Sequence, residues 1–468
     1  MIMRHELLLV LAAVLVLMVD LGVKPEKKLV VIPITLVLFC AVTVIGFLPA
    51  PEGKLFGGMY HTNSLTVLMK NILNLGLLIV MLQSSTWLSK EENREKLSEF
   101  FVLLMSTLIG MNFMISSGDF LMFYLGLELA TIPLAALAAY VHAQNKSAEA
   151  GIKLILISAL SSGILLFGLS MIYGTTGSIY FDQVRANFTG APLQILGFIF
   201  FVTGMGFKIS LVPFHLWTAD VYEGAPVNVT SYLSVVSKGA AVFIFIIILY
   251  TVFSSIMALW KDIIYFIAIL TMTIGNLFAL RQKNLKRFLA FSSIAQAGFI
   301  LLGILPGSQL GMTSVVYFVL IYIFTNLGAF GVISAISART GKETMDDYDG
   351  LYHTNPKLSL LMTLSLFSLA GIPPVAGFFG KFFLFTSAAS AGYYWLVFIA
   401  VLNATISLYY YLLIVKAMFI NKNDEPIAHF KSDFTTRLGL VICLAGMVII
   451  GFYSLIYEFI NNNTFGIN

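Results

Sequence analysis

Long apolar runs recur along almost the whole chain and are separated by short polar stretches. A helix needs roughly 20 mostly apolar residues to cross the hydrocarbon core of a bilayer, and on that criterion we count about fourteen predicted spans. The opening stretch 1–22 has no small-x-small cleavage site, so we expect it to remain as the first helix. The predicted spans centre near Val14, Leu38, Leu75, Leu108, Ala130, Leu160, Val202, Gly239, Thr271, Phe299, Val319, Ala370, Val401 and Gly446.

Composition places the chain among all-α polytopic membrane proteins. Hydrophobic residues make up 59% and charged residues 11%, with a mean hydropathy of +0.93, whereas soluble domains carry roughly 25% charged residues. The net charge of +4 is too small to indicate nucleic-acid binding. Cys40 and Cys443 form no ligand motif, which argues against haem, iron–sulfur and zinc sites. We expect both to be buried as small hydrophobes.

The distribution of basic residues predicts the orientation. Most of the 27 lysines and arginines fall in loops that follow odd-numbered helices, including the segments 24–28, 89–96 and 281–287. Because loops rich in Lys and Arg stay in the cytoplasm, both termini are predicted on the opposite side. The expected location is therefore a multi-pass protein of the bacterial inner membrane with periplasmic termini.

Lysines within the predicted spans are the main candidate functional residues. They are Lys70, Lys153, Lys208, Lys238, Lys381 and Lys416. A lysine at a helix centre costs roughly 2.5–3.5 kcal/mol on insertion scales. Lys70, Lys153 and Lys416 lie near span ends, where the side chain can reach the interface.

Lys208, Lys238 and Glu128 lie too deep in their spans for their side chains to reach the membrane interface. Desolvation disfavours the ammonium, so a buried lysine can both bind and release a proton. A static Glu–Lys pair that only fixes helix packing is the alternative. Lys208 and His215 are seven residues apart and would share a helix face, as would Ser231, Ser234 and Lys238. Such groups suit a hydrated path, although an interfacial role for His215 is at least equally consistent with its position.

Two predicted helices are interrupted in a similar way. The seventh contains Gly204, Gly206 and Pro213, and the twelfth contains Gly371, Pro373 and Pro374. Interruptions at depth are tolerated only where the freed carbonyls meet protein or water. Helices 4–8 and 9–13 would then form two inverted five-helix repeats. The predicted segments are 1–95 (three N-terminal helices), 96–255 (first repeat), 256–420 (second repeat) and 421–468 (C-terminal helix).

Four stretches carry a specific family resemblance: 125–137 (LGLELATIPLAAL), 206–238 (GFKISLVPFHLW through SVVSK), 284–299 (NLKRFLAFSSIAQAGF) and 368–385 (SLAGIPPVAGFFGKFFLF). They resemble the antiporter-like N-type subunits of NADH-quinone oxidoreductase, or respiratory complex I. By this resemblance Glu128 pairs with Lys208, Lys153 lies between them, Lys238 is the central lysine and Lys381 leads to the far side. The proton path is then expected to comprise Glu128, Lys153, Lys208, His215, Lys238 and Lys381.

The resemblance also implies the surroundings of the chain. NADH, FMN, iron–sulfur clusters and quinone are expected on other subunits, with no cofactor on this chain. Expected partners are the bilayer, the M-type neighbour, the small K- and J-type subunits and the lateral helix of the L-type subunit, and no nucleic acid. Alternative functions are a subunit of a sodium/proton antiporter or a membrane-bound hydrogenase, or a passive scaffold. A lipid-substrate enzyme would have to use the acidic segment 344–350, which is better explained as a solvated loop.

Overall fold

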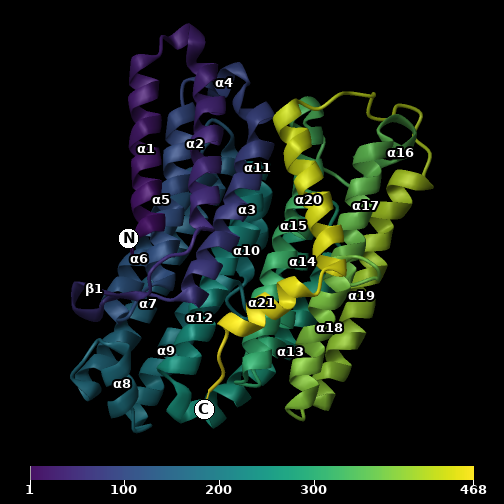
Figure 1. Cartoon of the computed structure of the whole chain (residues 1–468). Helices are drawn as coiled ribbons and strands as arrows, with labels where there is room; N and C mark the ends of the chain where they lie inside the picture. The colour runs from purple at the N-terminus through teal and green to yellow at the C-terminus, as the bar shows by residue number, and fades with distance from the viewer. Residues whose placement is uncertain (1, 468) are drawn as a thin grey trace.

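The computed structural model describes residues 2–467 and consists almost entirely of helices that run roughly side by side (Figure 1). Within these residues, 13 helices are long and apolar enough to cross a membrane. One further crossing is made of two shorter helices, which brings the arrangement to the fourteen that the apolar runs predict. The fold is therefore the expected all-α polytopic one.

The N-terminal part contains three spans and a small hairpin. These are α1 (Arg4–Gly22), η1 (Pro25–Val30), α2 (Val31–Gly46), β1 (Gly53–Leu55), η2 (Phe56–Gly58), β2 (Tyr60–Thr62), α3 (Ser64–Leu88) and α4 (Glu91–Arg94). The antiparallel β1–β2 pair, in which Lys54 lies opposite His61, was not expected from hydropathy. The hairpin forms most of the loop between the second and third spans.

The next five spans correspond to the predicted first repeat. Their elements are α5 (Leu97–Ile115), α6 (Phe120–Ala138), α7 (Asn145–Thr176), α8 (Phe181–Asn187), α9 (Pro192–Ile209), α10 (Leu216–Gly224), α11 (Val227–Tyr232), η3 (Leu233–Ser237) and α12 (Lys238–Thr251). The η3 segment is a π-helical turn within the eighth span. The turn lies immediately before Lys238, and neither hydropathy nor spacing predicts it.

The remaining elements correspond to the predicted second repeat and the last span. They are η4 (Ser254–Ile256), α13 (Met257–Ala279), α14 (Leu285–Ile304), α15 (Gln309–Thr340), η5 (Asp346–Tyr348), α16 (Leu351–Thr354), α17 (Pro356–Ala370), α18 (Ala376–Ser390), α19 (Tyr394–Phe419), α20 (Phe434–Phe452) and α21 (Leu455–Asn463). Side-chain caps fix some of the starts: Asp119 accepts from the backbone of α6, and Asn284 from that of α14.

Both predicted interruptions are present. The seventh span breaks after α9, where Ser210 has φ 68°, and resumes as α10. The twelfth breaks after α17, where Gly371 has φ 87°, and resumes as α18. The first break corrects one expectation: Lys208 and His215 do not share a helix face, because they lie on different helices on either side of it.

The first two helices of each predicted repeat pack closely together, α5 with α6 and α13 with α14. A Cβ on Gly110 of α5 would lie 2.4 Å from the backbone nitrogen of Ala130 on α6, and one on Gly275 of α13 would lie 2.6 Å from that of Ala295 on α14. Small residues allow such backbone approach within membranes. This likeness agrees with a repeat, although the inverted relation itself stays a prediction.

Burial separates a central layer from an outer one. The spans built on α12, α14 and α15 are almost fully buried, whereas only about a third of α1, α19 and α20 is buried. The outer helices present side chains such as Leu11, Leu21 and Trp395 to the surroundings. Among the cysteines, Cys443 is buried as predicted, but Cys40 is exposed on the outer side of α2, so the prediction for it is wrong.

Candidate functional site: a series of buried lysines

Lys208 lies in the last turn of α9, just before the first break. Its ammonium donates a hydrogen bond to the Thr131 hydroxyl on α6. Two small cavities flank it, each with about 10 Å³ of space for water. That is about the room that one water molecule needs. One cavity extends toward Ser158 and Ser161 of α7, and the other, here called the lysine cavity, is shared with Lys238.

Glu128 lies on α6, one turn before Thr131. It is half-buried, and its Oε1 atom has no hydrogen-bond partner within residues 2–467. In the same described region no ion pair joins Glu128 to Lys208, so the direct pair that the resemblance implies is absent from this structure. Thr131, which accepts from Lys208, follows Glu128 by three residues on α6.

Lys238 begins α12 directly after the π-helical turn, and only 4% of it is exposed. Its ammonium donates to the Ser293 hydroxyl of α14 at 2.6 Å and lies 3.4 Å from the Ser293 carbonyl oxygen. The Tyr222 ring centre is 6.0 Å away. No carboxylate pairs with this lysine among the described residues. An ammonium at this position has no opposite charge in contact with it among the described residues.

Lys381 lies on α18, beyond the second break, and is also 4% exposed. Its ammonium donates to the carbonyl oxygen of Ala370, the last residue of α17, at 3.1 Å. The Phe299 ring centre lies 4.5 Å away. The last carbonyls of a helix have no partner within that helix. The interruption of the twelfth span thus provides the acceptor that keeps Lys381 inside the bundle.

Side chains on α14 connect Lys238 to Lys381. Gln296 follows Ser293 by one turn and donates to the Leu369 carbonyl oxygen at 3.1 Å. Leu369 precedes Ala370, which accepts from Lys381. The Gln296 Oε1 atom is buried and unpaired in the described chain, which suits a water molecule. Sequence reasoning missed Ser293 and Gln296 although both lie in a stretch it singled out.

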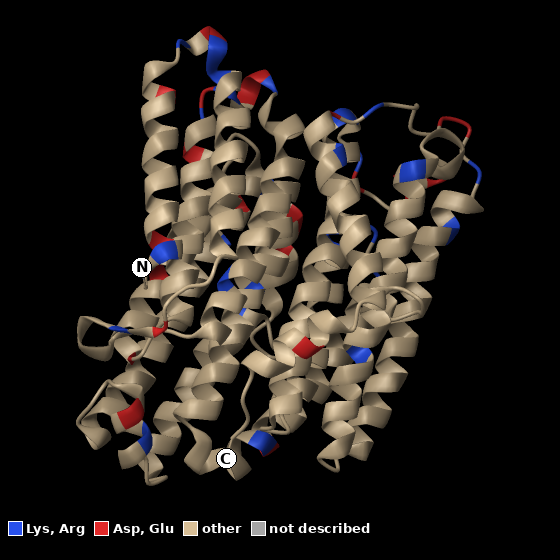
Figure 2. Ribbon diagram, viewed as in Figure 1, with Lys and Arg blue, Asp and Glu red and all other residues tan. Residues whose placement is uncertain are grey.

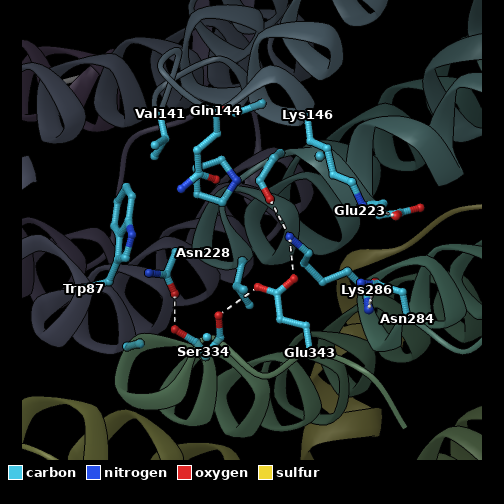
Figure 3. Close-up of a pocket in the computed structure, with 18 of the residues that line it drawn as sticks. Trp87, Val141, Gln144, Lys146, Glu223, Asn228, Asn284, Lys286, Ser334 and Glu343 are labelled. Atoms are coloured by element: carbon cyan, nitrogen blue, oxygen red, sulfur yellow. Dashed lines mark hydrogen bonds and ion pairs between the residues drawn. The ribbon is translucent and has the colours of Figure 1, made fainter. Parts of the chain in front are cut away.

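A larger pocket of about 310 Å³, here called the vestibule, opens at the ends of α7, α10 and α14 (Figure 3). Its lining includes Lys146, Glu223, Asn228, Lys286 and Glu343. Figure 3 shows Lys286 beside Glu343, and the two groups lie 3.0 Å apart. The Lys286 ammonium also donates to the Ala225 carbonyl oxygen at 3.1 Å.

Hydrogen-bonded polar groups lead from the vestibule toward Lys238. Ser334 donates to the Asn228 side chain at 2.6 Å, and the Ser231 hydroxyl donates to the Asn228 carbonyl oxygen at 2.8 Å. Ser234 donates to the Ser231 carbonyl oxygen at 2.9 Å. Lys238 follows Ser234 by four residues, across the π-helical turn. The predicted shared face of Ser231, Ser234 and Lys238 stays a prediction.

The other two predicted site residues differ from these lysines. Lys153 is half-exposed and pairs with Glu149 at 2.6 Å and with Asp220 at 2.7 Å. Its expected place between Glu128 and Lys208 stays a prediction. His215 is buried at the start of α10, and its Nδ1 atom is unpaired within the described residues. Neither His215 nor Lys153 contacts the three buried lysines through a hydrogen bond.

Lys70 corrects a further expectation. It does not reach the interface but is 1% exposed and pairs with Glu6 of α1 at 2.6 Å. Tyr60 of β2 donates to the same carboxylate at 2.8 Å and accepts from Lys70 at 2.9 Å. The hairpin covers this end of α3 and removes the water that a snorkelling side chain requires. Lys416, in contrast, is exposed as predicted.

Comparisons with known proteins agree with this arrangement. The family described as NADH:quinone oxidoreductase/Mrp antiporter, TM matches residues 117–407. A protein from Phocaeicola vulgatus named NADH-quinone oxidoreductase subunit N is 51% identical over 461 residues, covering 98% of both chains. A second protein of that name, from Azobacteroides pseudotrichonymphae, is 50% identical over 468 residues, covering 99% of this chain and 98% of its own.

Comparison with solved structures shows that the fold is shared as well. A chain of respiratory complex I from Thermus thermophilus with bound aureothin is 26% identical, with a TM-score of 0.82 over 97% of this chain and 98% of its own. A chain of the Mrp complex from Dietzia sp. DQ12-45-1b has a TM-score of 0.86 over 99% of this chain and 97% of its own. Its 20% identity shows a shared fold alone. Sequence and fold together place this chain in the family of NADH-quinone oxidoreductase N subunits, the antiporter-like subunits of the membrane arm.

Proposed function

We propose that the chain moves protons across the membrane within a complex that passes electrons from NADH to quinone. The observation that carries this proposal is the series of the partly buried Lys208 and the buried Lys238 and Lys381, with small cavities and polar side chains beside them. Ionisable groups at such depth are costly and are kept for ion pathways.

The proposed route begins at the vestibule and follows Asn228, Ser231 and Ser234 to Lys238. From Lys238 the proton passes along Ser293 and Gln296 to Lys381 and leaves on the periplasmic side. Lys208 and Glu128 modulate Lys238 through their charge. The lysine cavity, which both ammonium groups line, provides the low-dielectric space in which one charge affects the other strongly.

Energy for this movement comes from other subunits in the proposal. Moving one charge against 100 mV costs roughly 2.3 kcal/mol. The chain carries no sequence motif for nicotinamide, flavin or iron–sulfur clusters. Quinone reduction elsewhere would change the field at Glu128 and Lys208, which shifts the proton on Lys238. The proposed catalytic contribution of the chain is therefore transport rather than redox chemistry.

The proposed setting is the bacterial inner membrane, with both termini in the periplasm. Figure 2 supports this orientation, because Lys and Arg gather at the end of the bundle that carries α4 and α16. The vestibule lies on that cytoplasmic side in the proposal. The M-, K- and J-type subunits and the lateral helix of the L-type subunit remain the proposed partners, and the exposed apolar outer helices offer surface for them and for lipid.

The alternatives differ in what they predict. A sodium/proton antiporter is suggested by the fold shared with the Mrp chain, and it predicts transport that depends on sodium. NADH-driven pumping by the reconstituted complex, with sodium varied from zero to saturating, tests the proposal. We expect the same initial acidification rate at every sodium concentration. A rate that vanishes without sodium would instead support the antiporter alternative.

A passive scaffold needs no buried amine, so it predicts that replacing Lys238 by Ala leaves NADH-driven pumping intact. Our proposal predicts that pumping falls.

A further inference from the structure

The short helix α10 separates the vestibule from the lysine cavity. Glu223 and Gly224, at its end, line the vestibule, whereas Trp217 and Tyr222 line the lysine cavity. Irregular backbone flanks α10 on both sides, at 210–215 and at 225–226. The helix can therefore change position as a unit without unwinding a neighbouring span. The helix α10 therefore forms part of the wall between the two spaces.

Four ion pairs hold α10 between two other helices. Asp220 accepts from Lys153 of α7 and from Arg287 of α14, each at 2.7 Å. Glu223 pairs with Arg287 at 3.2 Å and with Lys146 of α7 at 2.9 Å. Two of these pairs join α10 to α7 and the other two join it to α14. The two carboxylates thus bridge the predicted first repeat to α14 of the predicted second repeat.

These pairs differ in kind from a permanent structural contact. Asp220 and Arg287 are 37% and 32% exposed, whereas both members of the Glu6–Lys70 pair are 1% exposed. Partly exposed ion pairs are individually weak and exchange readily with water. Several such pairs acting on one short helix can close it firmly and still release it when one cation moves. That combination is suited to a reversible closure.

We propose that α10 is a gate between the vestibule and the lysine cavity, and that Asp220 and Arg287 are positioning residues that hold it closed. The inference deepens the proposed function and rests on it, since the gate controls whether vestibule water enters the lysine cavity, beside the route along Asn228, Ser231 and Ser234. Neither residue carries the proton itself. Opening requires that Asp220 and Glu223 exchange their protein cations for water, and the loss of the Asp220 pairs makes this easier.

Accessibility of a thiol in the lysine cavity tests the gate directly. Ser237 lines that cavity, is buried, and is small enough for conversion to Cys. The exposed Cys40 is first replaced by Ser, and the buried Cys443 is left in place. Inside-out vesicles containing the assembled complex are treated with a membrane-impermeant cationic thiosulfonate, and the labelling rate of S237C is measured.

We expect slow labelling in the parent and labelling about three- to thirtyfold faster in Asp220→Asn, as two partly exposed ion pairs are lost. Arg287→Gln removes two pairs from the α14 side and is expected to accelerate labelling in the same way. Glu149→Gln is the matched control, because Glu149 pairs with the same Lys153 but lies on α7 with it. Its rate is expected to stay within about twofold of the parent.

Equal labelling rates in D220N, R287Q and E149Q would overturn the gate. Electron transfer from NADH to quinone in the same vesicles reports assembly, and D220E is expected to restore slow labelling. The outcome is independent of the sodium and Lys238 experiments. If those fail while D220N and R287Q accelerate labelling, the gate stands and the proposed route is wrong.

Discussion

Gln296 provides a sharp test of the route between Lys238 and Lys381. Its side-chain nitrogen donates to the Leu369 carbonyl oxygen at 3.1 Å and lies 3.4 Å from the Tyr411 hydroxyl. The change Gln296→Leu keeps nearly the same volume but removes every polar atom at this point of the route. It leaves the Leu369 carbonyl oxygen without that donor, at a place where Gln296 and Leu369 are 1% and 3% exposed.

The magnitude follows from this lost contact. An unsatisfied buried group costs about 1–3 kcal/mol. If the cost falls on the proton-transfer step, that step slows by about five- to 150-fold, because each 1.36 kcal/mol is a factor of ten in rate. We therefore expect the ratio of protons pumped to NADH oxidised to fall, while electron transfer continues. Simultaneous recording of NADH absorbance and of a pH-sensitive dye in inside-out vesicles gives this ratio.

Gln83 supplies a matched control. It is a buried glutamine of α3 that donates to the Leu327 carbonyl oxygen of α15, also at 3.1 Å, but it lies outside the lysine series. Gln83→Leu should lower stability as much as Gln296→Leu does and leave the pumping ratio unchanged. Equal ratios in the two variants, whether both normal or both reduced, would refute a proton route through Gln296.

Two further predictions concern the stability of the bundle. Lys70→Met leaves the Glu6 carboxylate buried without its partner, so we expect about 3–5 kcal/mol of destabilisation, partly recovered by adding Glu6→Gln; thermal unfolding of the purified complex checks both. If K70M alone unfolds at the parent temperature, the ion pair has no structural role. Gly110→Val would place a Cβ 2.4 Å from the Ala130 nitrogen, so we expect the chain to be lost from membranes, as quantified by immunoblot. Normal levels would contradict the close approach of α5 and α6.

The spans and their most important lysines could be predicted because both follow from desolvation along a single helix. Lys238 lies in an apolar run too long for its side chain to leave, and it is buried. The same rule is wrong for Lys70, since its partners are supplied from elsewhere in the chain. Glu6 is on another helix and Tyr60 is on a hairpin that hydropathy does not reveal. Proximity to a span end predicts water only if nothing covers that end.

Contacts between helices could not be predicted from the sequence for a related reason. Spacing predicted a shared face for Lys208 and His215, but the chain leaves helical geometry at Ser210 and the face ends there. Asp220 and Arg287 are far apart in the sequence, and each looks like an ordinary charge near a loop. Only the packing of α10 against α14 brings them together at 2.7 Å. Their signal was present in the family motif, but the motif alone assigns them no partner.

The central claim is that the buried amine of Lys238 carries protons during turnover. The most direct test compares the number of protons pumped per NADH in complexes with Lys238→Ala and with Lys416→Ala, since Lys416 is an exposed lysine of α19. We predict a lower ratio for K238A at retained assembly, and an unchanged ratio for K416A. A parental ratio in an assembled K238A complex would contradict the account.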